Sequence, residues 1–121
     1  GMRIACAAGP WLRQRLHADF LVVNAENAAD GTGLRISEYE RLIQAGYDVI
    51  TLGDHVYRKK EIMDRLRHSD RLLRPLNFPV SSAGRGYTTV TSRNGVPVSV
   101  ISLLGRVFMR PVDCPFHAFN R

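Results

Sequence analysis

The sequence has little cysteine, almost no lysine and no long apolar run. Its only cysteines are Cys6 and Cys114, and neither belongs to a Cys-x-x-Cys pair. This scarcity argues against a structural zinc site and against a framework of disulfide bonds. We interpret both as free thiols of a cytoplasmic protein, and a disulfide between them is the alternative.

The apolar stretches are far shorter than the roughly 20 residues that a helix needs to cross a bilayer. There is also no charged start followed by an apolar segment and a cleavage site, which would mark a secretory signal. We therefore expect no membrane association and a cytoplasmic location. Gly1 precedes Met2 and is interpreted as a remnant of cloning, so one domain is expected over residues 2–121.

Lysine occurs only at Lys59 and Lys60, so arginine provides nearly all of the positive charge behind the formal net charge of +6. Arginine suits phosphate because its planar guanidinium donates two hydrogen bonds at once. A nucleotide or nucleic-acid partner would therefore be compatible with this composition. The arginines are scattered, however, and form no basic helix, so a solvated basic surface is the simpler interpretation.

Apolar patterns and turn residues predict an α/β order of elements. We expect strands over residues 2–8, 19–25 and 47–52, helices over 9–18, 34–46 and 58–68, a loop over 27–33 and mostly irregular chain over 72–86. Two alternating runs within residues 87–105 flank Asn94-Gly95, which predicts a β-hairpin with a type I′ turn. The expected fold is therefore a parallel βαβ core with a C-terminal β-hairpin.

The strand, helix, strand order from residue 19 to residue 52 makes the two strands parallel, with both carboxyl ends at one edge of the sheet. Glu26 and Asn27 follow the first of these strands, and Asp54 and His55 follow the second. Ligands of open α/β sheets bind beyond that edge. We therefore expect these four side chains to converge.

Two carboxylates, an amide oxygen and an imidazole suit a site for divalent metal and phosphate. Glu26, Asn27 and Asp54 would supply oxygen ligands, and two ions together would clamp a phosphate and activate a water. His55 would stabilise or protonate the leaving oxygen as the catalytic residue. The alternative is that Glu26 and Asn27 cap their loop, Asp54 caps the following helix and His55 is a hydrogen-bonded structural residue.

Four blocks extend this interpretation: "NAENAADGTGL", "AGYDVITLGDHVYRKKEI", "RLLRPLNFPVSSAGRGY" and "GRVFMRPVDCPF". Together, in this order and with these gaps, they resemble the bacterial YmdB-type metallophosphoesterases, a branch of the calcineurin-like superfamily. The resemblance runs from about Ala18 to Phe116. It implies a partial metallophosphoesterase-like sandwich, hydrolysis of cyclic nucleotides or other phosphodiesters, and iron, manganese or magnesium as the divalent metal.

The resemblance implies that the family's metal-binding site is present only in part. Glu26, Asn27 and His55 match family positions, whereas Asp54 stands where the family has asparagine. The family's opening strand ends in Gly-Asp and supplies a metal-binding aspartate, but the matching place near Gly9 has no carboxylate. The loop and half-helix that should follow look deleted, because Gly9 is too close to Glu26. Three further histidine ligands of the family would lie beyond Arg121. We therefore expect no complete two-metal centre in this chain.

Arg85 and Arg106 belong to the family-like blocks and are candidate substrate-binding residues for phosphate. The alternative is that they pin the long loop by donating to backbone carbonyls, since neighbouring glycines allow close backbone approach.

Three hypotheses remain open: a truncated phosphoesterase with weak or no activity, a non-catalytic oligomeric module that binds nucleotide or RNA phosphate, and a piece of a longer protein. Because the second half of the family's sandwich is missing, apolar surface on the sheet would face water. Such a surface usually marks an interface, so a homo-oligomer is expected, with the hairpin or a sheet edge at the contact.

Overall fold

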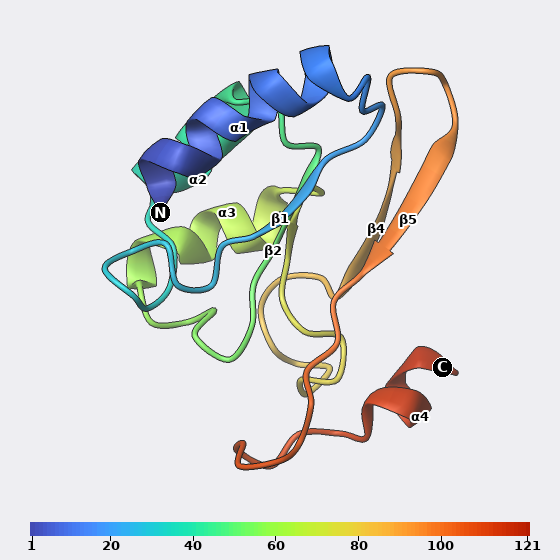
Figure 1. Cartoon of the computed structure of the whole chain (residues 1–121). Coiled ribbons are helices and arrows are strands. Elements are labelled where there is room, and N and C mark those ends of the chain that lie inside the picture. The colour runs from blue at the N-terminus through green and yellow to red at the C-terminus, as the bar shows by residue number, and fades with distance from the viewer.

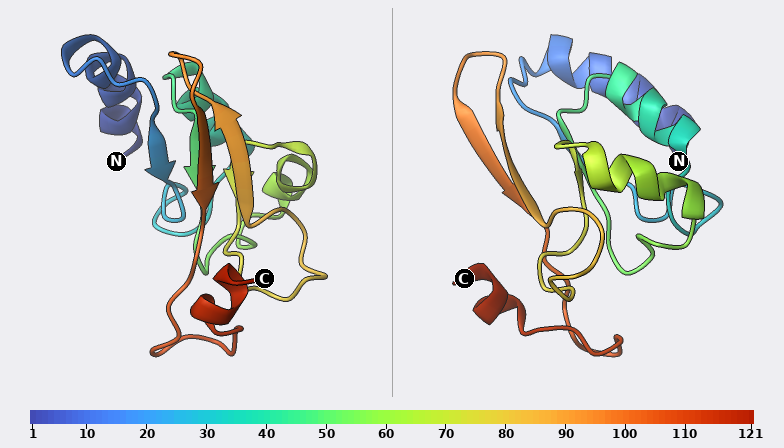
Figure 2. Two further views of the ribbon diagram at one scale, coloured as in Figure 1. Left: turned by 90° about the vertical axis from the view of Figure 1, so that its right-hand side faces the viewer. Right: turned by 180° about the vertical axis from the view of Figure 1, so that it is seen from behind.

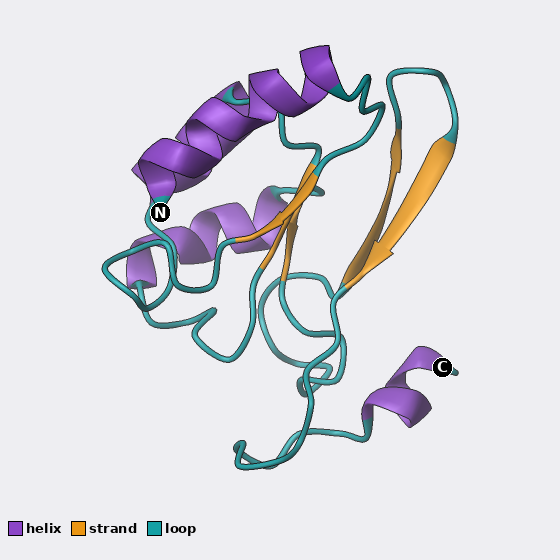
Figure 3. Cartoon of the chain, in the orientation of Figure 1, coloured by secondary structure: helices purple, strands orange, loops and turns teal.

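The computed structural model describes residues 1–121 and contains five helices and five strands, coloured by type in Figure 3. In chain order these are α1 (Met2–Arg15), β1 (Val22–Asn24), α2 (Ile36–Gln44), β2 (Val49–Thr51), the 3-10 helix η1 (Lys60–Ile62), α3 (Met63–His68), β3 (Leu72–Leu73), β4 (Tyr87–Thr91), β5 (Pro97–Ile101) and α4 (Pro115–Phe119). The helices α1, α2 and α3 lie on one side of the parallel sheet and the β4-β5 hairpin lies on the other, as the front and back views both show (Figures 1 and 2).

The parallel sheet has the strand order β1-β2-β3 and forms the centre of the core. Val23 pairs with Ile50, and Ile50 in turn pairs with Leu72. Ile50 and Leu72 are fully buried, and so are Leu42 of α2 and Leu66 of α3. Parallel strands that are buried on both faces have nearly continuous apolar sequences. The stretches "DVITL" and "RLL" contain such short apolar runs. The predicted α/β class is confirmed.

The predicted strand over residues 2–8 is wrong, because these residues form the first half of α1. Met2, Ala5, Cys6 and Leu12 pack against the core, and this spacing is that of one helix face. Gly9 lies on the same face, where an added Cβ would come within 2.1 Å of the Ala45 carbonyl oxygen. The alanines of "IACAA" favour helix, and a period of 3.6 rather than 2 explains which residues are buried.

The helix at the start of the chain also bears on the resemblance to the family's opening strand. Gly9 lies inside a helix and not at the end of a strand, so it is not the counterpart of the family's Gly-Asp. The helix that leads to β1 has 14 residues. Leu12 packs against the core, whereas Trp11 and Leu16 are exposed.

A buried ion pair fixes α1 to the sheet. The Arg13 guanidinium donates to Asp48, to the Ala18 carbonyl oxygen at 2.8 Å and to the Gly46 carbonyl oxygen at 2.7 Å. The same Asp48 oxygen accepts the Leu21 amide at 2.7 Å. One carboxylate therefore holds the end of α1, the start of β1 and the start of β2 together.

The predicted hairpin is present over residues 87–101, with Thr89 opposite Ser99, but the prediction of a type I′ turn is wrong. Only Gly95 has a positive φ, of 85°, and Asn94 does not. The Gly95 amide donates to the Ser92 carbonyl at 3.0 Å, and the Ser92 amide donates to the Val96 carbonyl at 2.8 Å. The connection is thus a longer turn with one glycine in the left-handed region, a common alternative to the two-residue loop.

Most large apolar side chains that remain exposed lie outside the parallel sheet. They are on α1, on the hairpin and along the C-terminal segment, and include Ile4, Trp11, Tyr87, Leu103, Val107, Phe108, Phe116 and Phe119. Val22 of the edge strand β1 is also exposed. Both cysteines are free thiols, as expected. None of the helices is both long enough and apolar enough to span a bilayer.

Candidate functional site

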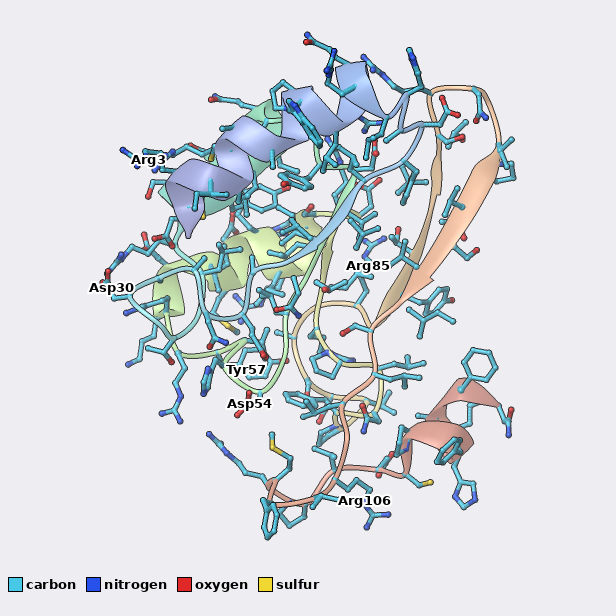
Figure 4. The ribbon with its side chains drawn as sticks, viewed as in Figure 1. Arg3, Asp30, Asp54, Tyr57, Arg85 and Arg106 are labelled. Carbon is cyan, nitrogen blue, oxygen red and sulfur yellow. The ribbon has the colours of Figure 1, made fainter.

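Two loops meet at the carboxyl-terminal edge of the parallel sheet. Asn24 ends β1 and pairs with Thr51, which ends β2, so the residues after each strand emerge side by side. The first loop contains Glu26 and Asn27, and the second contains the Gly53 to His55 cluster. Figure 4 shows Asp54 in this second loop, beneath the sheet and close to Tyr57.

Glu26 packs directly against the backbone of Gly53. A Cβ added at Gly53 would lie 1.5 Å from a carboxylate oxygen of Glu26, and two atoms that are not bonded to each other cannot come so close. Glycine at position 53 therefore gives the Glu26 carboxylate its place beside the second loop. The two loops also touch at Gly33, where a Cβ would lie 3.1 Å from Arg58 and whose φ is 79°.

His55 bridges the two loops. Its Nδ1 lies 2.8 Å from Oδ1 of Asn27, and its Nε2 lies 3.5 Å from Oδ2 of Asp54. Because an amide oxygen only accepts, Nδ1 carries the hydrogen of this bond. Nε2 is then the other ring nitrogen, and it lies beside the Asp54 carboxylate.

The four residues Glu26, Asn27, Asp54 and His55 are therefore brought together by the strand order, as expected. Asp54 does not cap the following helix, because Lys59 is the residue that precedes η1. His55 is hydrogen-bonded, which a structural role would also require. Their roles in metal binding and catalysis stay predictions.

Asp54 also lines a cavity of about 390 Å³ between the second loop and the C-terminal segment. Tyr57 and Phe78 form one wall, with ring centroids 6.1 Å apart and planes tilted by 50°. Arg58 and Arg110 lie at its border. None of these four residues was predicted from the sequence, although "DHVYR" places Tyr57 and Arg58 three and four residues after Asp54.

Arg74 is a further residue that sequence reasoning missed. It follows β3 at the same edge of the sheet and is buried, yet no carboxylate pairs with it and its Nε has no hydrogen-bond partner. Residues 72–86 were expected to be irregular, so Arg74 was not placed at a strand end. A strand of two residues, Leu72–Leu73, is too short for an apolar pattern to reveal.

Arg85 and Arg106 lie apart from the four clustered residues. Arg85 is exposed and borders an open hollow with Arg67 and Thr89, whereas Arg106 is exposed on the C-terminal segment beside Cys114 (Figure 4). Neither guanidinium donates to a backbone carbonyl, so the loop-pinning alternative finds no support. Substrate binding by these two arginines stays a prediction.

Cys114 near the end of the chain has a perturbed thiol. The amide of His117 donates to it, and this bond, helped by the amide of Phe116 and by Arg106, lowers the pKa of Cys114. Cys114 is half-buried, and these local donors outweigh the opposite effect of burial on the pKa of its thiol.

The clustered residues do not by themselves fit a two-metal centre. Nowhere in the chain do three or more His, Cys, Asp or Glu side chains group closely enough to hold a metal ion. The oxygen of Asn27 is already bonded to His55, which leaves the carboxylates of Glu26 and Asp54 as the free donors. Two ions held in a fixed geometry need more ligands than this.

Comparisons with known proteins identify the family. The YmdB-like protein family matches residues 1–121. A 2′,3′-cyclic-nucleotide 2′-phosphodiesterase of Bacillus subtilis is 45% identical over 107 residues, which cover 88% of this chain and 40% of that protein. A hypothetical protein of Thermus thermophilus, known from its crystal structure, superposes with a TM-score of 0.88 at 35% identity and covers 98% of this chain.

A phosphatase of Mycoplasma pneumoniae, also solved as a crystal structure, superposes with a TM-score of 0.84 at 29% identity over 98% of this chain. The present chain spans 46% of the Thermus protein and 44% of the Mycoplasma protein, so it covers less than half of either. The match over every residue and the shared fold agree with the four sequence blocks, and the chain belongs to the YmdB-like family.

Proposed function

We propose that this chain is a phosphodiesterase-family domain that binds a phosphodiester at the Glu26, Asn27, Asp54 and His55 edge of its sheet, with weak or no hydrolysis by these 121 residues alone. The contact of His55 with Asn27 across the two loops is the observation that supports it most directly. The Bacillus relative acts, by its name, on 2′,3′-cyclic nucleotides, so a cyclic nucleotide or another phosphodiester is the substrate class we infer.

In this proposal His55 supplies the proton chemistry. Asn27 fixes the ring through Nδ1, so Nε2 faces the phosphodiester and protonates the leaving oxygen. Asp54 lies beside Nε2 and helps to orient the ring. A divalent ion such as manganese, iron or magnesium would, when bound, stabilise charge on the phosphate and lower the pKa of a water. We assign it no step, because the donors present do not fit a two-metal centre.

The test is hydrolysis of bis-p-nitrophenyl phosphate and of 2′,3′-cyclic AMP with added manganese, beside a metal analysis of the protein. Turnover is expected far below roughly 1 s⁻¹, the lower end of typical enzymes, because ligands for a fixed metal pair are lacking. Any residual turnover should fall at least about tenfold in His55→Gln. The matched control is His68→Gln, whose ring lies exposed on α3 away from the site.

Two results would contradict the proposal. Turnover above roughly 1 s⁻¹ would show that this chain holds a competent centre. Residual turnover that is unchanged in both His55→Gln and Glu26→Gln would show that the activity does not use this edge of the sheet. Binding of cyclic AMP without turnover at any manganese concentration would favour the second candidate, a non-catalytic nucleotide-binding module.

The expected homo-oligomer stays a prediction. The exposed apolar side chains of the hairpin and C-terminal segment, Tyr87, Leu103 and Phe108 among them, favour self-association because their burial would remove apolar surface from water. Sedimentation velocity at several concentrations should show a species larger than the 13.6 kDa chain. A single monomeric boundary throughout the concentration series would rule the oligomer out.

A further inference from the structure

The cavity beside Asp54 has the size and composition of a ligand site. Its volume of about 390 Å³ falls within the range of small-molecule pockets. Part of its lining comes from the loop after β2 and part from the irregular chain after β3 and from the C-terminal segment, so three stretches distant in sequence build it. Asp54 is the residue that this cavity shares with the candidate phosphodiester site.

The wall of this cavity is aromatic and held in place. The Tyr57 hydroxyl donates to the Ala83 carbonyl oxygen at 2.8 Å, which fixes the ring beside Phe78. Burial raises the pKa of the Tyr57 phenol, so the ring is uncharged at neutral pH. A planar heteroaromatic ring is the ligand group that stacks on such a wall, and stacking discriminates little between bases.

The border of the cavity is cationic. Arg58 and Arg110 are exposed, and neither forms an ion pair or a side-chain hydrogen bond. The buried Arg74 lies close enough to Tyr57 for its charge to affect the pKa of the phenol, and it too lacks a carboxylate partner. Two guanidiniums without a partner, those of Arg58 and Arg110, therefore line the cavity together with the Asp54 carboxylate, and free guanidiniums bind phosphate by paired donation.

We propose that this cavity is a nucleoside-phosphate subsite. The base stacks on the Tyr57–Phe78 wall, a phosphate binds Arg58 and Arg110 at the border, and the nucleotide extends toward Asp54. This inference rests on the proposed function, because the subsite belongs to the proposed phosphodiester site. Its residues would make that site prefer a nucleotide to a phosphodiester that has no base.

Calorimetric titration of metal-free protein with adenosine 5′-monophosphate and with ribose 5-phosphate tests the subsite. The two probes share sugar and phosphate and differ only in the base. Adenosine 5′-monophosphate is expected to bind at least about tenfold more tightly, since stacking on an aromatic side chain supplies that much affinity. Equal dissociation constants for the two probes would overturn the subsite.

Two variants separate the base from the phosphate contact. Phe78→Leu should weaken adenosine 5′-monophosphate binding several-fold and leave ribose 5-phosphate unchanged, whereas Arg110→Gln should weaken both. Arg93→Gln is the matched control, because Arg93 is an exposed arginine of the hairpin turn without an ion pair. Arg110 is also exposed, so its variant should fold normally, and an unchanged affinity for both probes in Arg110→Gln would exclude the phosphate contact.

Failure of the subsite and failure of the proposed function are distinguishable, because this titration uses neither metal nor turnover. A preference for adenosine 5′-monophosphate, with residual turnover that is unchanged in both His55→Gln and Glu26→Gln, would keep the subsite and remove the proposed function. Hydrolysis without a preference for the base would do the reverse.

Discussion

Replacing Arg13 by alanine is expected to lower the free energy of unfolding by about 3–5 kcal/mol, the usual effect of removing one partner from a buried ion pair. The Arg13 side chain is 9% exposed and that of Asp48 is 16% exposed. Removal of the guanidinium leaves the Asp48 carboxylate with the Leu21 amide alone and leaves the carbonyls of Ala18 and Gly46 without their donor. Urea unfolding followed by circular dichroism measures the change.

Arg15→Ala is the matched control, because Arg15 is an exposed arginine of the same helix with no ion pair. Its effect should stay within about 0.5 kcal/mol. The double variant Arg13→Met with Asp48→Asn should recover part of the loss, since it leaves no uncompensated buried charge. If Arg13→Ala and Arg15→Ala destabilise equally, the ion pair does not fix α1 to the sheet.

Replacing Asn77 by alanine is expected to cost about 3 kcal/mol, because buried polar groups that lose their partners cost about 1–3 kcal/mol each. Asn77 is fully buried. Its amide donates to the carbonyl oxygens of Leu104 at 2.8 Å and Asp113 at 3.0 Å, and its oxygen accepts the Leu104 amide at 2.9 Å. These bonds hold the C-terminal segment against the rest of the chain.

The same variant should weaken adenosine 5′-monophosphate binding, because residues 104 and 109–112 of that segment complete the cavity. Thermal unfolding gives the stability change and the calorimetric titration gives the affinity. Asn120→Ala is the control, since the Asn120 side chain is exposed and makes no hydrogen bond. A stable Asn77→Ala protein with unchanged ligand affinity would show that Asn77 does not organise this wall.

The Asn77 contacts illustrate why half of the candidate site could not be found in the sequence. "RPLNFP" contains no periodic pattern, and nothing in it indicates that its asparagine meets a segment 27 residues further on. Tyr57 and Phe78 are likewise 21 residues apart and meet only because irregular chain folds under the sheet. Local patterns report local structure, whereas loop-to-loop contacts depend on the whole fold.

The start of the chain shows a different limit. An apolar run as short as residues 2–8 fits both a strand and a buried helix face, and the pattern alone does not decide between them. Packing against α2 decides it, because Gly9 lets the α1 backbone approach Ala45. The strand prediction failed for this reason, and the alignment of Gly9 with the end of the family's opening strand failed with it.

The sequence alone determined the parallel βαβ order, the hairpin and the family, because apolar periodicity and contiguous motifs are written in neighbouring residues. It also determined that Glu26, Asn27, Asp54 and His55 meet, since parallel strands place their carboxyl ends at one edge. Only the tertiary structure decided that α1 is a helix, that Arg74 is buried without a carboxylate partner, and that an aromatic cavity opens beside Asp54. Those features arise from contacts between distant segments, whose geometry no single stretch of sequence specifies.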